Sequence, residues 1–129
     1  MALSIFRVAL SIFAGAALGA TAIQALHAQA KPPVYYIAEI NVTNPELYGR
    51  EYAPKAQAMI KAAGGRFLAA GQNITSFEGE PPKQRVVIQV WDNMEKIQVW
   101  LNIREWKELL KVSQKYATFR EFAAEGLPQ

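Results

Sequence analysis

A charge-free run at residues 8–30 limits most strongly what this chain can fold into, because it contains no Lys, Arg, Asp or Glu. The run follows Arg7 and consists mainly of small and aliphatic residues. It ends in Ala28-Gln29-Ala30, the A-x-A pattern that a signal peptidase cleaves. We therefore predict a cleaved signal peptide at residues 1–30, which leaves residues 31–129 for one small domain.

An uncleaved membrane anchor over residues 8–30 is the alternative reading of the same run. A helix of this length could span the roughly 30 Å of bilayer hydrocarbon at about 1.5 Å per residue. The polar residues Gln24, His27 and Gln29 shorten its apolar part, which favours cleavage. We expect a periplasmic protein, with inner-membrane anchoring as the alternative and no other contact with the membrane.

The residue types that the chain lacks exclude several kinds of chemistry. It has no Cys, and its one His, His27, lies in the predicted signal peptide. This excludes a disulfide framework, a Cys nucleophile, a Cys/His zinc site, a His-ligated haem and a His general base. We therefore expect no metal and no cofactor. The basic residues behind the net charge of +3 are scattered, so we also expect no nucleic-acid partner.

The pattern of residues after the signal peptide predicts a domain of mixed helices and strands at residues 34–126. Residues 31–33 form a stiff linker before it, and residues 127–129 form a tail. We expect strands at 34–42, 66–70 with a continuation at 74–78, 85–91 and 118–122, and helices at 45–63 and from Asp92 onward. Pro54 should kink the first helix, Gly64-Gly65 should end it, and the second should bend near residues 102–104. A bulge or bend is expected at Gly71.

The resulting order, β-α-β-β-α-β, predicts an α+β fold of the ferredoxin-like type. In this arrangement two helices cover one face of a single antiparallel sheet. On the first strand, Val34, Tyr36, Ala38, Ile40 and Val42 should face the helices. The other face should carry Tyr35, Ile37, Val87 and Trp91, an apolar patch that a second copy of the chain would cover.

Several short motifs resemble one bacterial family. They are listed here as they stand in the chain: Tyr35-Tyr36-Ile37-Ala38-Glu39-Ile40, Thr43-Asn44-Pro45-Glu46-Leu47-Tyr48, Gly64-Gly65-Arg66-Phe67-Leu68 with Gly71 and Glu78-Gly79, and Val86-Val87-Ile88 before Met94-Glu95. From Tyr35 to Gly126 the chain resembles the family known as domain of unknown function 1330, within the dimeric α/β-barrel superfamily. The resemblance implies a homodimer whose sheets pack face to face around a cavity, and it implies no established activity.

Two features depart from that family. Most of its members lack an export signal, and the second helix here reads Asn102-Ile103-Arg104-Glu105-Trp106 where a Ser-Pro-Glu-Tyr-like step is usual. Related barrels include cofactor-independent monooxygenases, isomerases and haem-handling enzymes, which is an analogy of fold alone.

The candidate site residues follow from the predicted sheet. Glu39 and Arg66 are the catalytic candidates, as a general base and a clamp for a ligand carboxylate. Tyr35, Gln89 and Trp91 are expected to join them as walls of a ligand-binding cavity on the open face. Structural roles are the alternatives. Glu39 would pair with an Arg across the dimer, Arg66 would form a salt bridge or contact a carbonyl group, and the aromatic side chains would only pack.

Two functional hypotheses lead, ahead of a cofactor-dependent enzyme, which the absence of Cys and of His outside the signal peptide disfavours. The first is an exported dimer that binds or transforms a small organic molecule without metal or haem. The alternative is a non-catalytic structural or partner-binding periplasmic dimer. The sequence does not decide whether the protein is an enzyme.

Overall fold

The computed structural model describes residues 31–128. The predicted signal peptide at residues 1–30 lies outside the described residues. Within them, no helix has both the length and the apolar character needed to cross a membrane.

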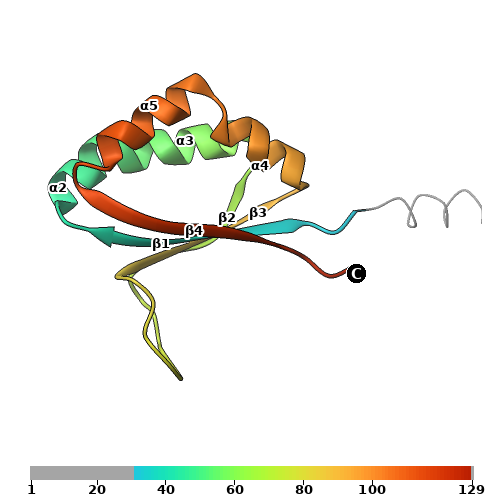
Figure 1. Cartoon of the computed structure of the whole chain (residues 1–129), viewed down its shortest axis with the longest axis horizontal. Coiled ribbons are helices and arrows are strands. Elements are labelled where there is room, and N and C mark those ends of the chain that lie inside the picture. Colours follow the sequence, from blue (N-terminus) through green and yellow to red (C-terminus); the bar gives the residue numbers. More distant parts are fainter. Residues whose placement is uncertain (1–30, 129) are drawn as a thin grey trace, which may run out of the picture. The chain divides into compact units, whose positions relative to one another are not determined.

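One antiparallel sheet carries all the helices on a single face (Figure 1). The elements, in chain order, are β1 (Val34–Val42), α2 (Pro45–Leu47), the π-helical turn η1 (Tyr48–Tyr52), α3 (Ala53–Ala63), β2 (Arg66–Gly71), β3 (Arg85–Trp91), α4 (Met94–Leu101), α5 (Arg104–Ser113) and β4 (Ala117–Glu125). The strands lie in the order β2-β3-β1-β4. This is the predicted ferredoxin-like α+β arrangement, with β1 and β3 in the centre and β2 and β4 at the edges.

The first helix contains the predicted irregularity at Pro54. The backbone N–H of Ala53 donates to the carbonyl of Tyr48, five residues back, so the helix passes through a π turn immediately before the proline. Proline lacks an N–H, and its ring collides with the carbonyl of residue i−4 in a regular helix, which accounts for the irregular turn. The turn buries Tyr48 and Tyr52 against the sheet.

The same helix ends where the sequence predicts. Gly64 has φ +111°, in the left-handed region that favours glycine. The N–H of Gly65 donates to the carbonyl of Ile60 at 2.9 Å, and that of Gly64 to the carbonyl of Lys61 at 3.1 Å. These two bonds form a Schellman motif, which satisfies the last carbonyl groups of α3.

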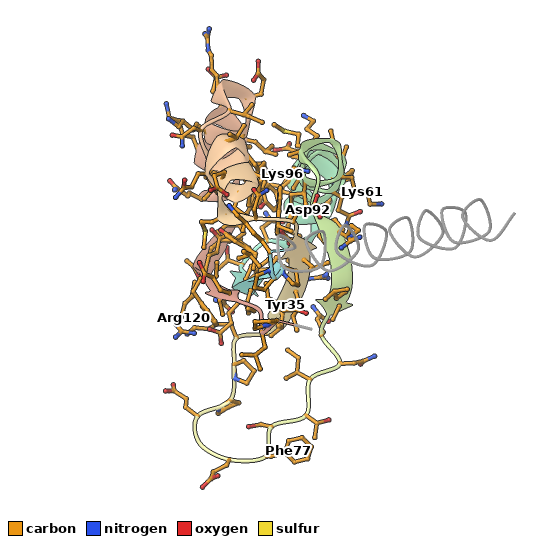
Figure 2. All side chains as sticks on the ribbon, turned by 90° about the vertical axis from the view of Figure 1, so that its right-hand side faces the viewer. Tyr35, Lys61, Phe77, Asp92, Lys96 and Arg120 are labelled. Atoms are coloured by element: carbon orange, nitrogen blue, oxygen red, sulfur yellow. The ribbon has the colours of Figure 1, made fainter. Side chains whose placement is uncertain are left out.

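Residues 74–78 do not continue β2, so that prediction was wrong. β2 ends at Gly71, whose partner Val86 is one residue from the start of β3. A strand needs a partner for its backbone groups, and the segment that precedes β3 contains Pro81 and Pro82, which have no N–H to offer. Residues 72–84 instead form a loop that projects away from the helices, with Phe77 at its tip (Figure 2).

Two smaller predictions also need correction. The bulge in β2 falls between Phe67 and Ala69 rather than at Gly71. The second helical region begins one residue later than expected, because Asn93, not Asp92, accepts the cap bond from the N–H of Lys96 at 2.9 Å. Its predicted bend is confirmed, since α4 ends at Leu101 and α5 starts at Arg104.

The core lies between the helices and the sheet and is rich in aromatic side chains. Trp91 of β3 stacks on Trp100 of α4 with ring centroids 5.1 Å apart, and Trp106 of α5 lies 4.5 Å from Trp100. Tyr36 of β1 meets the edge of Trp100 at 5.3 Å. Such pairs fix the positions of large, rigid rings in the core.

Candidate functional site

The strand register decides on which face each predicted site residue lies. Residues opposite each other on antiparallel strands project to the same side of the sheet. Val34 pairs with Trp91 and Tyr36 pairs with Gln89, so Trp91 and Gln89 lie under the helices with the first face of β1. The prediction that Gln89 and Trp91 line a cavity on the open face was therefore wrong, and Val87, opposite Ala38, is likewise on the helix side.

Trp91 and Gln89 are both buried in the helix-covered layer. Trp91 is 0% exposed, and its Nε1–H donates to the side-chain Oε1 of Gln89 at 2.9 Å. Trp91 therefore packs in the core, which was the alternative to a role in binding a ligand. Gln89 instead places an amide group among aromatic side chains.

Glu39 lies on the open face as predicted, but its partner is a residue of its own chain. It faces Arg120 across the β1–β4 ladder, and the two side chains form an ion pair. The Glu39 side chain is 14% exposed and that of Arg120 is 68% exposed. The carboxylate is thus engaged in a structural contact within one subunit, rather than the contact across a dimer that the structural alternative proposed.

Arg66 does not come near Glu39, so the predicted convergence was wrong. Arg66 pairs with Val90, and Val90 pairs with Tyr35, four residues from Glu39 along β1. Two strand spacings and four residues correspond to roughly 16 Å between the Cα atoms. Arg66 and Tyr35 lie near one end of the open face, and Glu39 lies toward the other.

The open face carries a wide groove of about 550 Å³. Its walls include the apolar side chains of Ile37, Ile88 and Phe122, together with the Glu39–Arg120 ion pair and the first part of the 72–84 loop. The groove is shallow and mostly apolar, as expected for a surface that packs against another protein surface.

A second cavity lies between the sheet and the helices, and it holds about 60 Å³. Its walls come from β1, β2, β3 and β4 below and from η1, α3, α4 and α5 above. Two wall residues, Gln57 of α3 and Ala70 of β2, are exposed, so the cavity opens to solvent between α3 and β2.

Polar groups are concentrated in the walls of this internal cavity. Arg85 lies at the start of β3 with its guanidinium carbon 5.7 Å from the ring centre of Tyr48. The carboxylate of Glu121, on β4, accepts a hydrogen bond from the hydroxyl of Tyr36 at 2.8 Å. Gln89 of β3 lies in the wall as well.

Three of the buried donors in these walls have no hydrogen-bond partner among the described residues. They are the Nε of Arg85 and the Nε1 atoms of Trp100 and Trp106. A buried donor without a partner costs about 1–3 kcal/mol, so native proteins leave few of them. Each of the three atoms has less than 1 Å² of accessible surface, so an atom in the cavity does not reach them.

Burial shifts the proton affinities of the acidic groups here. Desolvation raises the pKa of Tyr52 and of Tyr36, and the nearby Glu121 carboxylate raises the pKa of Tyr36 further. Desolvation also raises the pKa of Glu121, against the hydrogen bond from Tyr36, which lowers it. Glu121 as a residue is exposed along edge strand β4, but its carboxyl group points inward to Tyr36, so solvent moderates this shift without removing it.

Among residues 31–128, no group of three His, Cys, Asp or Glu side chains is placed to hold a metal ion. The polar side chains in the cavity walls are instead those of Arg85, Gln89, Glu121 and two tyrosines, Tyr48 and Tyr52. This set suits hydrogen bonding to oxygen atoms of an organic molecule.

The sequence analysis missed the residues that make this cavity polar. Arg85, Tyr48, Tyr52 and Glu121 were not named as site residues. One signal was present: Arg85 shares the face of β3 that carries Gln89, and Tyr48 and Tyr52 are four residues apart on one helical face. Which side of β3 faces the helices decides whether Arg85 and Gln89 reach the cavity, and this depends on the pairing of β3 with β1.

The fold and this site together define a small α+β protein of the ferredoxin-like fold, with an aromatic-walled cavity inside its helix–sheet layer. Residues 33–127 match the family model described as domain of unknown function DUF1330. The chain therefore belongs to the DUF1330 family, as its motifs indicated. No curated protein matches the chain.

Solved structures share the fold at low sequence identity. A protein of unknown function from Rhodopseudomonas palustris has a TM-score of 0.56 and 15% identity, over 83% of this chain and 93% of its own. SnoaB from Streptomyces nogalater, a cofactor-independent oxygenase, has a TM-score of 0.56 and 11% identity, over 76% of this chain and 96% of its own. A hypothetical Arabidopsis thaliana protein has a TM-score of 0.53 and 10% identity, over 78% and 91%. At these identities the likeness concerns the fold alone.

Proposed function

We propose that this protein binds a small organic molecule in the internal cavity, without a metal or haem. The observation that supports the proposal is a cavity that opens to solvent between α3 and β2 and has Arg85, Gln89 and Glu121 among otherwise mostly aromatic and apolar wall residues. Whether the ligand is also transformed depends on its chemistry.

Filling the cavity tests this proposal. Ala56 of α3 is 5% exposed and lines the cavity, so Ala56→Leu places three more carbon atoms in the space. Ala62, on the exposed side of the same helix, provides the control Ala62→Leu. Native mass spectrometry of protein purified from its own cells, with thermal-shift screening of small organic molecules, measures binding.

We expect wild type and Ala62→Leu to carry or bind a small molecule and Ala56→Leu to bind none. The smaller Ala56→Val, which should weaken binding only partly, covers the case in which Ala56→Leu fails to fold. A wild-type protein that binds nothing across the screen would refute the proposal. Equal binding by wild type and a folded Ala56→Leu would place the ligand elsewhere.

The proposal also includes a homodimer formed through the open sheet face. Support comes from the apolar side chains on that face, among which Tyr35 is 36% exposed and Phe122 is 44% exposed, and from the groove beside them. A second sheet packed on this face would remove the patch from water.

Light scattering at micromolar concentration tests the dimer. Ile88 lies on the open face opposite Ile37, so Ile88→Asp should give monomers by placing a charge in the interface. Lys111→Asp, an exposed change on α5, is the matched control and should leave the dimer intact. A wild-type protein that is already monomeric would rule out the dimer.

A further inference from the structure

The loop of residues 72–84 projects from the domain as an arm with an aromatic tip (Figure 2). Residues 75–81 are all exposed, and the side chain of Phe77 is 95% exposed. Within the arm one backbone hydrogen bond forms, from the N–H of Ile74 to the carbonyl of Gln72 at 2.9 Å. Loops of this length without regular structure are uncommon and are usually functional. The arm therefore buries little against its own subunit and leaves a large apolar ring in water.

Local residues hold this arm in an extended shape. Pro81 and Pro82 restrict the backbone of its returning half, and consecutive prolines make a stiff segment. Gly79 has φ +77°, which supplies the reversal beside the tip. A stiff arm loses little conformational freedom when it docks on another surface, so its shape is suited to binding a partner.

The direction of the arm points to a second copy of the chain as that partner. The arm leaves the sheet on the side opposite the helices, which is the side that the proposed dimer covers (Figure 1). Residues 72–77 can reach roughly 20 Å when extended, whereas packed sheets lie about 10 Å apart. Because the arm starts at edge strand β2, it can run along the edge of a second sheet and bring Phe77 against that edge.

The edge of β2 carries a surface that matches the tip of the arm. The bulge in β2 leaves Leu68 outside the strand register, and its side chain is 58% exposed. Arg66 is also exposed, and no carboxylate among residues 31–128 lies within ion-pair distance of it. Glu78, next to Phe77, likewise has no cation within that distance in the described part of the chain. Each surface thus has an apolar side chain beside an unpaired charge, and the two charges are opposite.

Two-fold symmetry can bring these two surfaces together. An axis that runs across the strands, between the two sheets, reverses the strand direction in the second copy. The end of β2 in one copy, where the arm starts, then lies beside the start of β2 in the other, where Arg66 and Leu68 lie. Arg120, the other arginine of the open face, already pairs with Glu39 and lies over the ring of Phe122. Arg66 is therefore the better partner for the arm.

Building on the proposed dimer, we infer that residues 72–84 form an exchanged arm, with which each copy packs Phe77 on Leu68 of the other copy and places Glu78 beside Arg66 of that copy. The contact occurs twice in the dimer, because the two copies are equivalent. The open sheet faces supply most of the buried area, and the charged contacts of the arms fix the register of one sheet on the other.

Sedimentation of a dilution series, which measures the dissociation constant of the dimer, tests the role of Phe77. Phe77→Ser should raise this constant at least about tenfold, because two buried rings are lost from the interface. Phe77→Leu keeps an apolar tip and should stay within about threefold of the wild type. Val99→Ser is the matched control, since Val99 of α4 is 66% exposed on the helix side and should leave the constant within about threefold.

A charge exchange tests which residues meet. Glu78→Arg alone and Arg66→Glu alone should each weaken the dimer at least about threefold at low salt, because each places like charges together. The double variant, with Glu78→Arg and Arg66→Glu, restores opposite charges and should return to within about twofold of the wild type. Glu95→Arg, an exposed change on α4, controls for net charge and should also stay within about twofold.

The outcomes separate this inference from the proposed dimer. If Ile88→Asp gives monomers but Phe77→Ser dissociates at the same concentration as the wild type, the arm is overturned and the dimer stands. Weakening by Phe77→Ser without rescue in the double charge variant would overturn the contact with β2, and this inference with it. A wild type that is monomeric at every concentration would refute the proposed dimer and the arm together. Binding of a small molecule in the internal cavity is measured independently of all these results.

Discussion

Gly65 offers a sharp test of which face of β3 is buried, the assignment on which the location of the site depends. A Cβ built on Gly65 would lie 2.7 Å from Cγ2 of Ile60 and 2.7 Å from Cζ2 of Trp91. Carbon atoms at optimal separation are about 3.5–4.0 Å apart, so the substitution Gly65→Ala forces a displacement of roughly 1 Å.

Neither neighbour can yield easily. Trp91 stacks on Trp100 and is hydrogen-bonded to Gln89, and Ile60 is 5% exposed on α3. Overpacking in a well-packed core costs about 1–3 kcal/mol. Because both contacts are with constrained groups, we expect about 2–3 kcal/mol for Gly65→Ala. In a domain of about 100 residues this corresponds to a fall in melting temperature of roughly 10–20 °C.

The assay is thermal and urea unfolding of Gly65→Ala beside Gly49→Ala. A Cβ on Gly49 meets nothing within 4 Å, and its position is exposed, so Gly49→Ala should be neutral or stabilising by up to about 1 kcal/mol. If Trp91 were on the open face, as the sequence analysis expected, Gly65→Ala would find no indole ring. A melting temperature within about 2 °C of wild type would therefore refute the described packing of β3 against α3.

Three further predictions follow from the described contacts and from the sequence. Glu121→Gln keeps an acceptor for Tyr36 and removes a carboxyl group whose pKa is raised in the folded state. The stability of the wild type should therefore fall as the pH rises from about 4 toward that raised pKa. Relative to the wild type, the melting temperature of the variant should rise between pH 4 and pH 7. No pH-dependent gain would show that the carboxyl group is fully hydrated. Asn93→Ala should cost about 1 kcal/mol in urea unfolding by removing the cap of α4. Asp92→Ala, which removes only an exposed ion pair with Lys96, should cost less, and the reverse ranking would contradict the observed cap. N-terminal sequencing of periplasmic protein should begin at Lys31, whereas intact chain in the membrane fraction would support the anchor.

The sequence by itself determined the local elements. Alternation identified β1 and its buried face, Gly64-Gly65 specified the end of α3, and Pro54 marked the irregular turn before it. These features depend on steric preferences of single residues and on period-two alternation, which act over a few neighbouring positions. The motifs also identified the family, which the match over residues 33–127 confirms.

Only the tertiary structure decided which side of β3 faces the helices. Alternation shows that Arg85, Val87, Gln89 and Trp91 share a face, but both faces of this central strand are rich in apolar residues. A shift of register by one residue would turn every side chain to the other side, so pairing with β1 fixes the orientation. The same pairing of strands placed Arg120 opposite Glu39, kept Arg66 far from it, and brought Arg85 into the cavity, because contacts between strands distant in sequence depend on the whole sheet.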